Sequence, residues 1–326
     1  MSRALDHEVK EALKHGDYEG VFNEIAGALS QHLSEPLEIE FLSRSHPIDK
    51  DTIFLQDGAC IAVPKLRLLQ AFIFARRVLL EYLNEPEKQD PDQVLKATAV
   101  ILLMDPEHLT ATNTRKRLVL SIAIRNEANI DKGLQAERYY IDSLLTSRLH
   151  RHTKSPTLWN HRQWLMERFE EHGLELEAVR IMETIVLVAA ERHPRNYYAW
   201  LHARYLVNKM TTDPADMQLQ ETLEASKKWA FSHHDDISGW AFLMFFLNEF
   251  PQHSAAVFAE TLKLAVSFHW RNESVWYFLR NMLHQPAVKE SHEVEFHSTR
   301  LALLKGARED SDERRILDQA LCWIES

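Results

Sequence analysis

The chain has 326 residues, 45% apolar and 26% charged, so it can bury a sizeable core and is neither disordered nor fibrous. Its formal net charge of −10 argues against a whole-protein role in binding nucleic acid or anionic lipid. It has only 8 glycines, where average usage of about 7% would give roughly 23. Because sheets, tight turns and phosphate loops consume glycine, this composition favours a nearly all-helical protein.

Cysteine usage and hydropathy place the chain inside the cell. The two cysteines, Cys60 and Cys322, lie far apart and form no C-x-x-C motif, so neither a disulfide framework nor a cysteine zinc site is expected. The longest apolar stretches, "IVLVAA" and "WAFLMFFL", are far shorter than the roughly 18 residues of a membrane span. The amino-terminal sequence lacks the apolar core of a signal peptide. We therefore expect a cytoplasmic protein without a transmembrane segment.

The amino-terminal part, residues 1–90, predicts helices and one extended segment. Apolar residues at helical spacing predict short helices at about 3–15 and 18–33. From 35 to 64 the pattern changes to an extended chain, either a hairpin or a long loop. A helix follows at about 64–83, opened by a proline in its first turn. It ends before "NEPEKQDP", which predicts a domain boundary near residue 90.

From residue 91 to 326 the chain is dominated by an internal repeat. Five segments align on one position, which we call the frame position, and successive copies are separated by 47, 41, 40 and 36 residues: Thr112, Trp159, Trp200, Trp240 and Trp276. Amphipathic helices such as "LEAVRIMETIVLVAAERH" run between the frame positions. The pattern predicts an all-α solenoid in which each period is an antiparallel helical hairpin stacked on the next.

The frame residues themselves predict packing rather than catalysis. Trp159 and Arg162 are three residues apart, so their side chains share one helix face. A buried indole removes about 150–250 Å² from water, roughly 4–6 kcal/mol as an upper estimate. We therefore assign a structural role to the recurring set: Trp159, Arg162, Trp200, Trp240 and Trp276.

These segments resemble the repeats of protein prenyltransferase alpha subunits, which read roughly N-Y-x-x-W-x-H-R. The phrases "NYYAWLH" and "NESVWYFLR" are similar to the third and fifth motifs of the farnesyltransferase alpha subunit. The resemblance covers about 91–285. Thr112 replaces the first tryptophan, and Ala203 stands where the third repeat has arginine. Within the family, "KSPTLWNHRQW" and "KKWAFSHHDDISGW" look most like the alpha subunits of type III geranylgeranyltransferases.

The resemblance implies a right-handed superhelix of helical hairpins that wraps a separate beta subunit. In that family the beta subunit holds the catalytic zinc and the isoprenoid diphosphate, so the chain is expected to bind no cofactor and to be inactive alone. The implied partner is the Rab geranylgeranyltransferase beta subunit. The implied reaction transfers geranylgeranyl from geranylgeranyl diphosphate to a cysteine of a protein substrate, such as a farnesylated SNARE or another cysteine-bearing protein.

The residues themselves offer no metal site, because "HRH" and "HHDD" lack the spacing of known zinc motifs. A helix that begins at each frame segment could hold an anion at its amino-terminal end, strengthened by a nearby cation. In the family, a second-repeat lysine reaches the diphosphate, and it corresponds to Lys154. The third-repeat residues at the active-site mouth correspond to Asn196, Tyr197 and Tyr198, the last replacing a histidine.

Two departures keep alternatives open. Pro156 replaces the second-repeat tyrosine, and Thr157 replaces a glutamine that binds the substrate carboxylate in farnesyltransferase. This favours substrates presented by a larger protein surface over a free C-a-a-X terminus. One alternative is the alpha subunit shared by farnesyltransferase and type I geranylgeranyltransferase. The other is a non-catalytic helical-repeat scaffold, favoured by the frame changes at Thr112 and Ala203.

Overall fold

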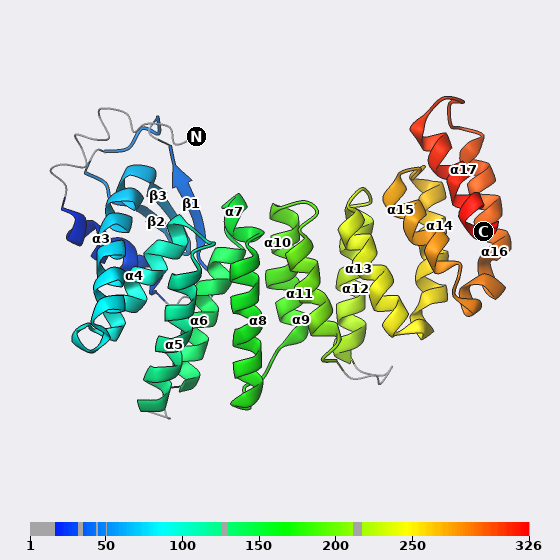
Figure 1. Ribbon diagram of the computed structural model, residues 1–326. Coiled ribbons are helices and arrows are strands. Elements are labelled where there is room, and N and C mark those ends of the chain that lie inside the picture. The colour runs from blue at the N-terminus through cyan, green and yellow to red at the C-terminus, as the bar shows by residue number, and fades with distance from the viewer. Residues whose placement is uncertain are drawn as a thin grey trace. The chain divides into compact units, whose positions relative to one another are not determined.

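The computed structural model describes residues 17–31, 35–43, 45–49, 51–125, 130–210 and 217–325 (Figure 1). The helix predicted at 3–15 lies outside these residues. The chain divides into two compact units, the first ending at Leu176 and the second beginning at Glu177. The boundary predicted near residue 90 falls inside the first unit, before the helix that starts at Pro91, and stays a prediction as a domain limit.

The first unit stacks helices in chain order, with each packing on its sequence neighbours (Figure 1). They are α2 (Tyr18–Leu29), α3 (Lys65–Asn84), the 3-10 turn η1 (Pro86–Lys88), α4 (Pro91–Met104), α5 (Leu109–Arg125), α6 (Ile130–Leu145), the short α7 (His150–Thr153) and α8 (Pro156–Glu171). The helices predicted at 18–33 and 64–83 are confirmed. The first ends earlier, at Leu29, and Pro64 stands just before the second.

The segment predicted as extended forms a small sheet. Its strands are β1 (Glu38–Leu42), β2 (Leu55–Asp57) and β3 (Cys60–Pro64), in the order β1-β3-β2. The hairpin alternative is right for β2 and β3, which are antiparallel, while β1 pairs in parallel with β3. Ser143 of α6 accepts a hydrogen bond from the Leu37 backbone at 2.8 Å, so the sheet is attached to the helical repeats.

The second unit continues with paired helices, and its first helix contains a wide turn. The elements are α9 (Ala178–Ile181), the π-helical turn η3 (Met182–Val186), α10 (Leu187–Arg192), α11 (Tyr197–Val207), α12 (Met217–Ser232), α13 (Ile237–Glu249), the 3-10 turn η4 (Pro251–His253), α14 (Ser254–Ser267), α15 (Glu273–Met282), α16 (Pro286–Leu304) and α17 (Asp312–Glu325). The frame helices α11, α13 and α15 pack successively on one another.

The all-α repeat architecture predicted from the frame is confirmed within each unit. All five frame residues are buried, and each lies in the first turns of a helix. The one sheet among the described residues is the small one near the amino terminus. The right-handed superhelix that the resemblance implied for the whole array stays a prediction.

Candidate functional site

Each frame helix begins three residues before its frame position, and the residue directly before the helix usually caps it. His108 Nδ1, Ser155 Oγ and Asn196 Oδ1 each accept a hydrogen bond from the backbone N–H three residues later, at 3.1, 3.1 and 3.3 Å. Asp236 Oδ1 does the same for Gly239 at 3.3 Å. Since a helix start leaves its first N–H groups without partners, these side chains fix where each repeat turns.

Buried indoles of the frame tryptophans stabilise the same turns by hydrogen bonds. Trp159 Nε1 donates to the carbonyl oxygen of Thr153 at 2.9 Å, and Trp276 Nε1 donates to that of Trp270 at 2.9 Å. Trp240 Nε1 makes the equivalent bond at 3.1 Å, again to the carbonyl six residues earlier. Trp200 is the exception, since its Nε1 is buried and has no hydrogen-bond partner among the described residues. The tryptophan therefore contributes a donor to the turn as well as apolar area.

Successive turns are also bonded to one another. In the first unit Ser155 Oγ donates to the Pro106 carbonyl at 3.2 Å, and Thr157 Oγ1 donates to Glu107 Oε2 at 2.6 Å. Thr157 thus takes part in packing between repeats.

In the second unit, the Arg195 N–H donates to Asp236 Oδ2 at 2.7 Å, and Asn272 Nδ2 donates to the His234 carbonyl at 2.6 Å. These bonds align the turns within each unit along one edge of the stack.

Lys154 lies on the turn between α7 and α8, directly before the Ser155 cap. Its side chain is exposed and makes no hydrogen bond or ion pair with the described residues. The start of α8 offers few backbone donors, because Pro156 has no N–H and the Leu158 N–H is already bound to Ser155. An anion at this turn would therefore depend chiefly on the Lys154 ammonium.

The three predicted third-repeat residues lie together at the start of α11 but differ in exposure. Asn196 is buried, with Oδ1 used in the cap and Nδ2 donating to the Ala189 carbonyl at 3.3 Å. Tyr197 is 64% exposed, and its ring meets that of Tyr198 edge-on at 5.3 Å. Only the tyrosines, therefore, present an accessible surface to a ligand or partner.

Two buried ion pairs join the first unit's repeats through α6. Arg162 Nε lies 2.7 Å from Asp142 Oδ1, and Arg115 Nε lies 2.8 Å from Glu137 Oε1. All four side chains are buried, and Arg115 also donates to the Leu95 carbonyl at 2.6 Å. Sequence reasoning missed Arg115 and Glu137. The spacing of Arg115 could have identified it, because Arg115 follows the frame residue Thr112 by three residues, just as Arg162 follows Trp159.

Burial controls the protonation of this cluster. Burial opposes ionisation of Glu137, but the Arg115 guanidinium outweighs it and holds the pKa of Glu137 below its usual value. Burial lowers the pKa of His161 to about 3, although its Nε2 lies 3.2 Å from Glu137 Oε1 without hydrogen-bond geometry. Burial also lowers the pKa of His152 to about 4, and its Nε2 faces the Leu103 carbonyl at 2.9 Å. Both histidines are neutral at pH 7.

Gly239, which directly precedes the frame residue Trp240, has a packing explanation in the second unit. A Cβ atom on Gly239 would lie 2.4 Å from Trp229 Cζ3, well inside contact distance. The absence of a side chain lets the Trp229 ring approach Trp200 at 4.9 Å, and Trp200 in turn stacks on Phe242 at 5.1 Å. Glycine at position 239 therefore makes room for an aromatic cluster.

No group of three or more histidine, cysteine or acidic side chains is arranged to hold a metal ion in the described parts of the chain. The segments "HRH" and "HHDD" have other roles. His152 bonds backbone carbonyls, and Asp236 caps α13. His233 Nε2 lies 2.6 Å from Glu191 Oε2 and its ring stacks on Trp229. Among the same described residues, no helix has the length and apolar composition needed to cross a membrane.

Two models of known protein families match parts of the chain. Residues 142–169 match the model of the protein prenyltransferase alpha subunit repeat. This segment is therefore similar to one prenyltransferase alpha subunit repeat. This match begins at Asp142 and includes Lys154, Trp159 and Arg162, so it spans both partners of one buried ion pair. Residues 158–268 also match the model of the ECM9 middle domain, and this range contains three frame tryptophans: Trp159, Trp200 and Trp240.

Curated relatives carry the same repeat in their names. The "Protein prenyltransferase alpha subunit repeat-containing protein 1" of Homo sapiens is 27% identical over 192 residues, or 54% of this chain and 44% of that protein. The Danio rerio protein of that name is 26% identical over 185 residues, or 51% of this chain and 40% of the relative. The Xenopus laevis protein 1-A is 26% identical over 192 residues, covering 54% and 41%. Each match spans less than half of the relative's length.

Proposed function

We propose that the chain is the alpha, non-zinc subunit of a heterodimeric protein geranylgeranyltransferase of type III. The repeat and the relatives named for it support a prenyltransferase-related subunit. The proposal assigns zinc and geranylgeranyl diphosphate to a beta subunit, most simply the one that serves Rab proteins. The protein substrate would be a cysteine-bearing protein, including one already farnesylated.

The observation that carries the proposal is the position of Lys154. The lysine of the family motif stands here on an exposed turn, with its ammonium unpaired among the described residues. Departure of diphosphate builds negative charge on its oxygens, and a cation fixed beside those oxygens lowers the barrier. Ser155 and the Trp159 indole hold the turn, so the lysine would be presented by a rigid base. The nucleophile would be the substrate thiolate, which zinc on the partner would generate.

An exposed apolar face on the second unit supports association with a partner. Tyr197 and Leu201 lie four residues apart on α11 and are 64% and 46% exposed. On the adjacent α13, the half-buried Phe245 carries the Arg204 guanidinium 5.0 Å above its ring. Exposed aromatic and aliphatic side chains beside an arginine are typical of protein–protein contacts.

Single-turnover transfer in the reconstituted complex tests the role of Lys154. We expect Lys154→Ala to slow transfer by about 10 to 100 fold while the complex still forms, because only charge stabilisation in the transition state is lost. The matched control is Lys305→Ala, which removes an exposed lysine from the end of α16. An equal rate for wild type and Lys154→Ala would remove this role.

A non-catalytic scaffold is the second candidate, and the hydrogen bonds of two residues favour it. Asn196 caps α11 and also donates to the Ala189 carbonyl, and Thr157 donates to Glu107, so two positions that serve ligands in the resembling enzymes are used here for packing. A scaffold would bind a protein partner with the same affinity whether or not Lys154 is replaced, and would show no geranylgeranyl transfer with any beta subunit.

A further inference from the structure

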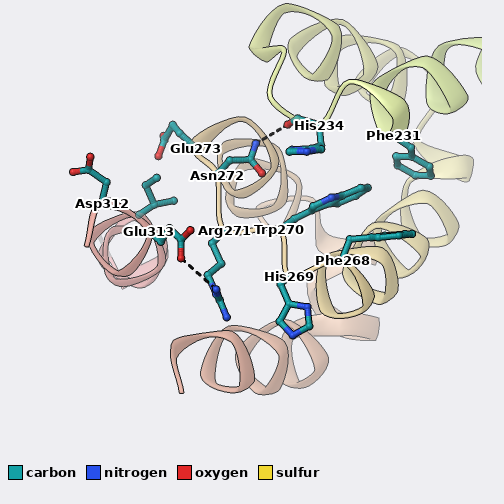
Figure 2. A pocket seen from close by; sticks show the side chains of 11 residues that line it. Phe231, His234, Phe268, His269, Trp270, Arg271, Asn272, Glu273, Asp312 and Glu313 are labelled. Atoms are coloured by element: carbon teal, nitrogen blue, oxygen red, sulfur yellow. Dashed lines mark hydrogen bonds and ion pairs between the residues drawn. The ribbon is translucent and has the colours of Figure 1, made fainter. Parts of the chain in front are cut away.

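Arg271 and Arg280 of the second unit are balanced by carboxylates of the same chain. Figure 2 shows an open cavity of about 680 Å³ beside Trp270, where Arg271 Nη1 lies 3.2 Å from Glu313 Oε2. Arg280 Nη2 likewise lies 2.8 Å from Glu273 Oε1. The charges on these two arginines therefore need no partner from outside the chain.

Arg204 on α11 differs, because it is half-buried and forms no ion pair within the described part of the chain. Its guanidinium carbon lies 5.0 Å from the centre of the Phe245 ring on α13, and Nη2 donates to the Ala241 carbonyl at 3.4 Å. α11 contains no acidic residue, and α13 contains only Glu249, at its end. A cation that is partly removed from water is destabilised unless a counter-charge lies nearby.

The first unit contains the same kind of cation and ring pair. Lys116 follows its frame position by four residues, and its Nζ lies 5.3 Å from the centre of the Trp164 ring on the next frame helix. Arg204 also follows its frame position by four residues, and both Trp164 and Phe245 follow theirs by five. The two pairs therefore occupy corresponding positions on neighbouring frame helices.

The two pairs differ in their counter-charge. Burial lowers the pKa of Lys116, and the carboxylate of Glu167, eight residues after its frame position, opposes this shift. The corresponding residue beside Arg204 is the neutral Asn248, whose Oδ1 accepts a hydrogen bond from Gln285 at 2.7 Å. The second unit thus has a neutral residue at the position from which the first unit supplies a carboxylate.

Exposed apolar side chains lie beside Arg204. Leu201 and Tyr197 stand one and two turns before it on the same face of α11, and they are 46% and 64% exposed. On the adjacent α13, Met244 and Phe245 are half-buried. An arginine among tyrosine and aliphatic side chains is typical of the residues that dominate protein–protein binding. A partner that covers this face would remove Arg204 from water and so requires a counter-charge of its own.

We propose that the partner protein places the carboxylate of an aspartate or glutamate, flanked by aliphatic side chains, against Arg204. This inference rests on the proposed function, in which the partner is a prenyltransferase beta subunit. The carboxylate accepts hydrogen bonds from the guanidinium, and the aliphatic side chains pack on Tyr197 and Leu201. An anionic lipid surface fits less well, because the formal net charge of the chain is −10.

Biolayer interferometry of the full chain against the immobilised Rab geranylgeranyltransferase beta subunit tests the proposal. Arg204→Gln should bind about 30-fold more weakly than wild type, and Arg204→Lys, which keeps the charge, about fivefold more weakly. The matched control is Arg308→Gln, which removes an exposed arginine between α16 and α17 and should bind like wild type. Without the beta subunit, Arg204→Gln should unfold within about 2 °C of wild type, because no ion pair between described residues is lost.

Position 248 provides a second test. Asn248→Glu supplies the carboxylate that Glu167 supplies in the first unit, so it should pair with Arg204 and repel the carboxylate of the partner. We expect this variant to bind the beta subunit about tenfold more weakly. Asn248→Gln is the neutral control and should bind like wild type. Equal binding by Asn248→Glu and Asn248→Gln would contradict the proposal.

The outcomes separate this inference from the proposed function. If the wild-type chain does not bind the beta subunit, the proposed function fails and this inference fails with it. If wild type and Arg204→Gln bind equally well, only the inference is overturned. It is also overturned if sedimentation shows a dimer of the chain that Arg204→Gln abolishes, because the face would then be a contact between copies.

Discussion

The two units use different side chains to fill the space beside the frame residues. In the first unit the residue three positions after the frame is an arginine, Arg115 or Arg162, paired with a buried carboxylate on α6. In the second unit the corresponding residues are Ala203, Leu243 and Leu279, and aromatic rings fill the space. Removing one partner of a buried ion pair leaves an uncompensated buried charge, whereas aromatic packing depends on how well the shapes of neighbouring side chains fit together. The units should therefore respond differently to substitution and to pH.

Loss of one ion-pair partner should have the largest effect. We expect Arg115→Leu to lower the free energy of unfolding of the first unit by about 3–5 kcal/mol, because the Glu137 carboxylate is left buried without its cation. Urea unfolding followed by circular dichroism measures this. The double variant Arg115→Leu/Glu137→Leu should recover most of the loss. If the single and double variants were equally unstable, the ion pair would not be the cause.

The second unit should be most sensitive at Gly239. We expect Gly239→Ala to cost about 1–3 kcal/mol, since the added methyl group would displace the Trp229 ring from Trp200. Gly133→Ala is the matched control, because a Cβ there meets nothing within 4 Å in a helix of the first unit. Thermal unfolding of the two variants should separate them, and equal midpoints would contradict the close approach.

Acidification should weaken the first unit. His152 and His161 have pKa values of about 4 and 3 in the folded chain, below the usual 6.5, so the unfolded chain binds more protons below pH 6.5. Stability is present above pH 6.5 and is lost as pH falls toward 4. Each histidine should contribute about 2 kcal/mol of loss between pH 7 and pH 5. His161→Phe should show roughly half of the wild-type decrease, and an unchanged decrease would exclude His161 as a source.

The smallest effect separates two tryptophans in the same unit. Trp276→Phe removes a hydrogen bond to the Trp270 carbonyl, whereas Trp200→Phe removes none, because Trp200 Nε1 has no hydrogen-bond partner in the part of the chain that the structure describes. Trp276→Phe should therefore cost about 1 kcal/mol more than Trp200→Phe. Guanidinium unfolding of the pair measures the difference, and equal losses would mean that the bond contributes nothing.

The repeat frame could be predicted from the sequence because a tryptophan at a fixed helix position leaves a visible period. The parallel pairing of β1 with β3 could not, since five-residue strands carry no sign of which neighbour they join. Asn196 shows a further limit for the candidate site. Its place in the motif predicts proximity to a ligand, but only the structure shows that the oxygen and the nitrogen of its side-chain amide both form hydrogen bonds to the backbone. The cavity beside Trp270 was missed because its walls come from three distant segments.

Co-expression with the Rab geranylgeranyltransferase beta subunit, followed by native mass spectrometry, tests the central proposal most directly. We predict a 1:1 complex that transfers geranylgeranyl to a protein cysteine, with neither chain active alone. A chain that purifies free of the beta subunit, or a complex without transfer activity, would contradict it.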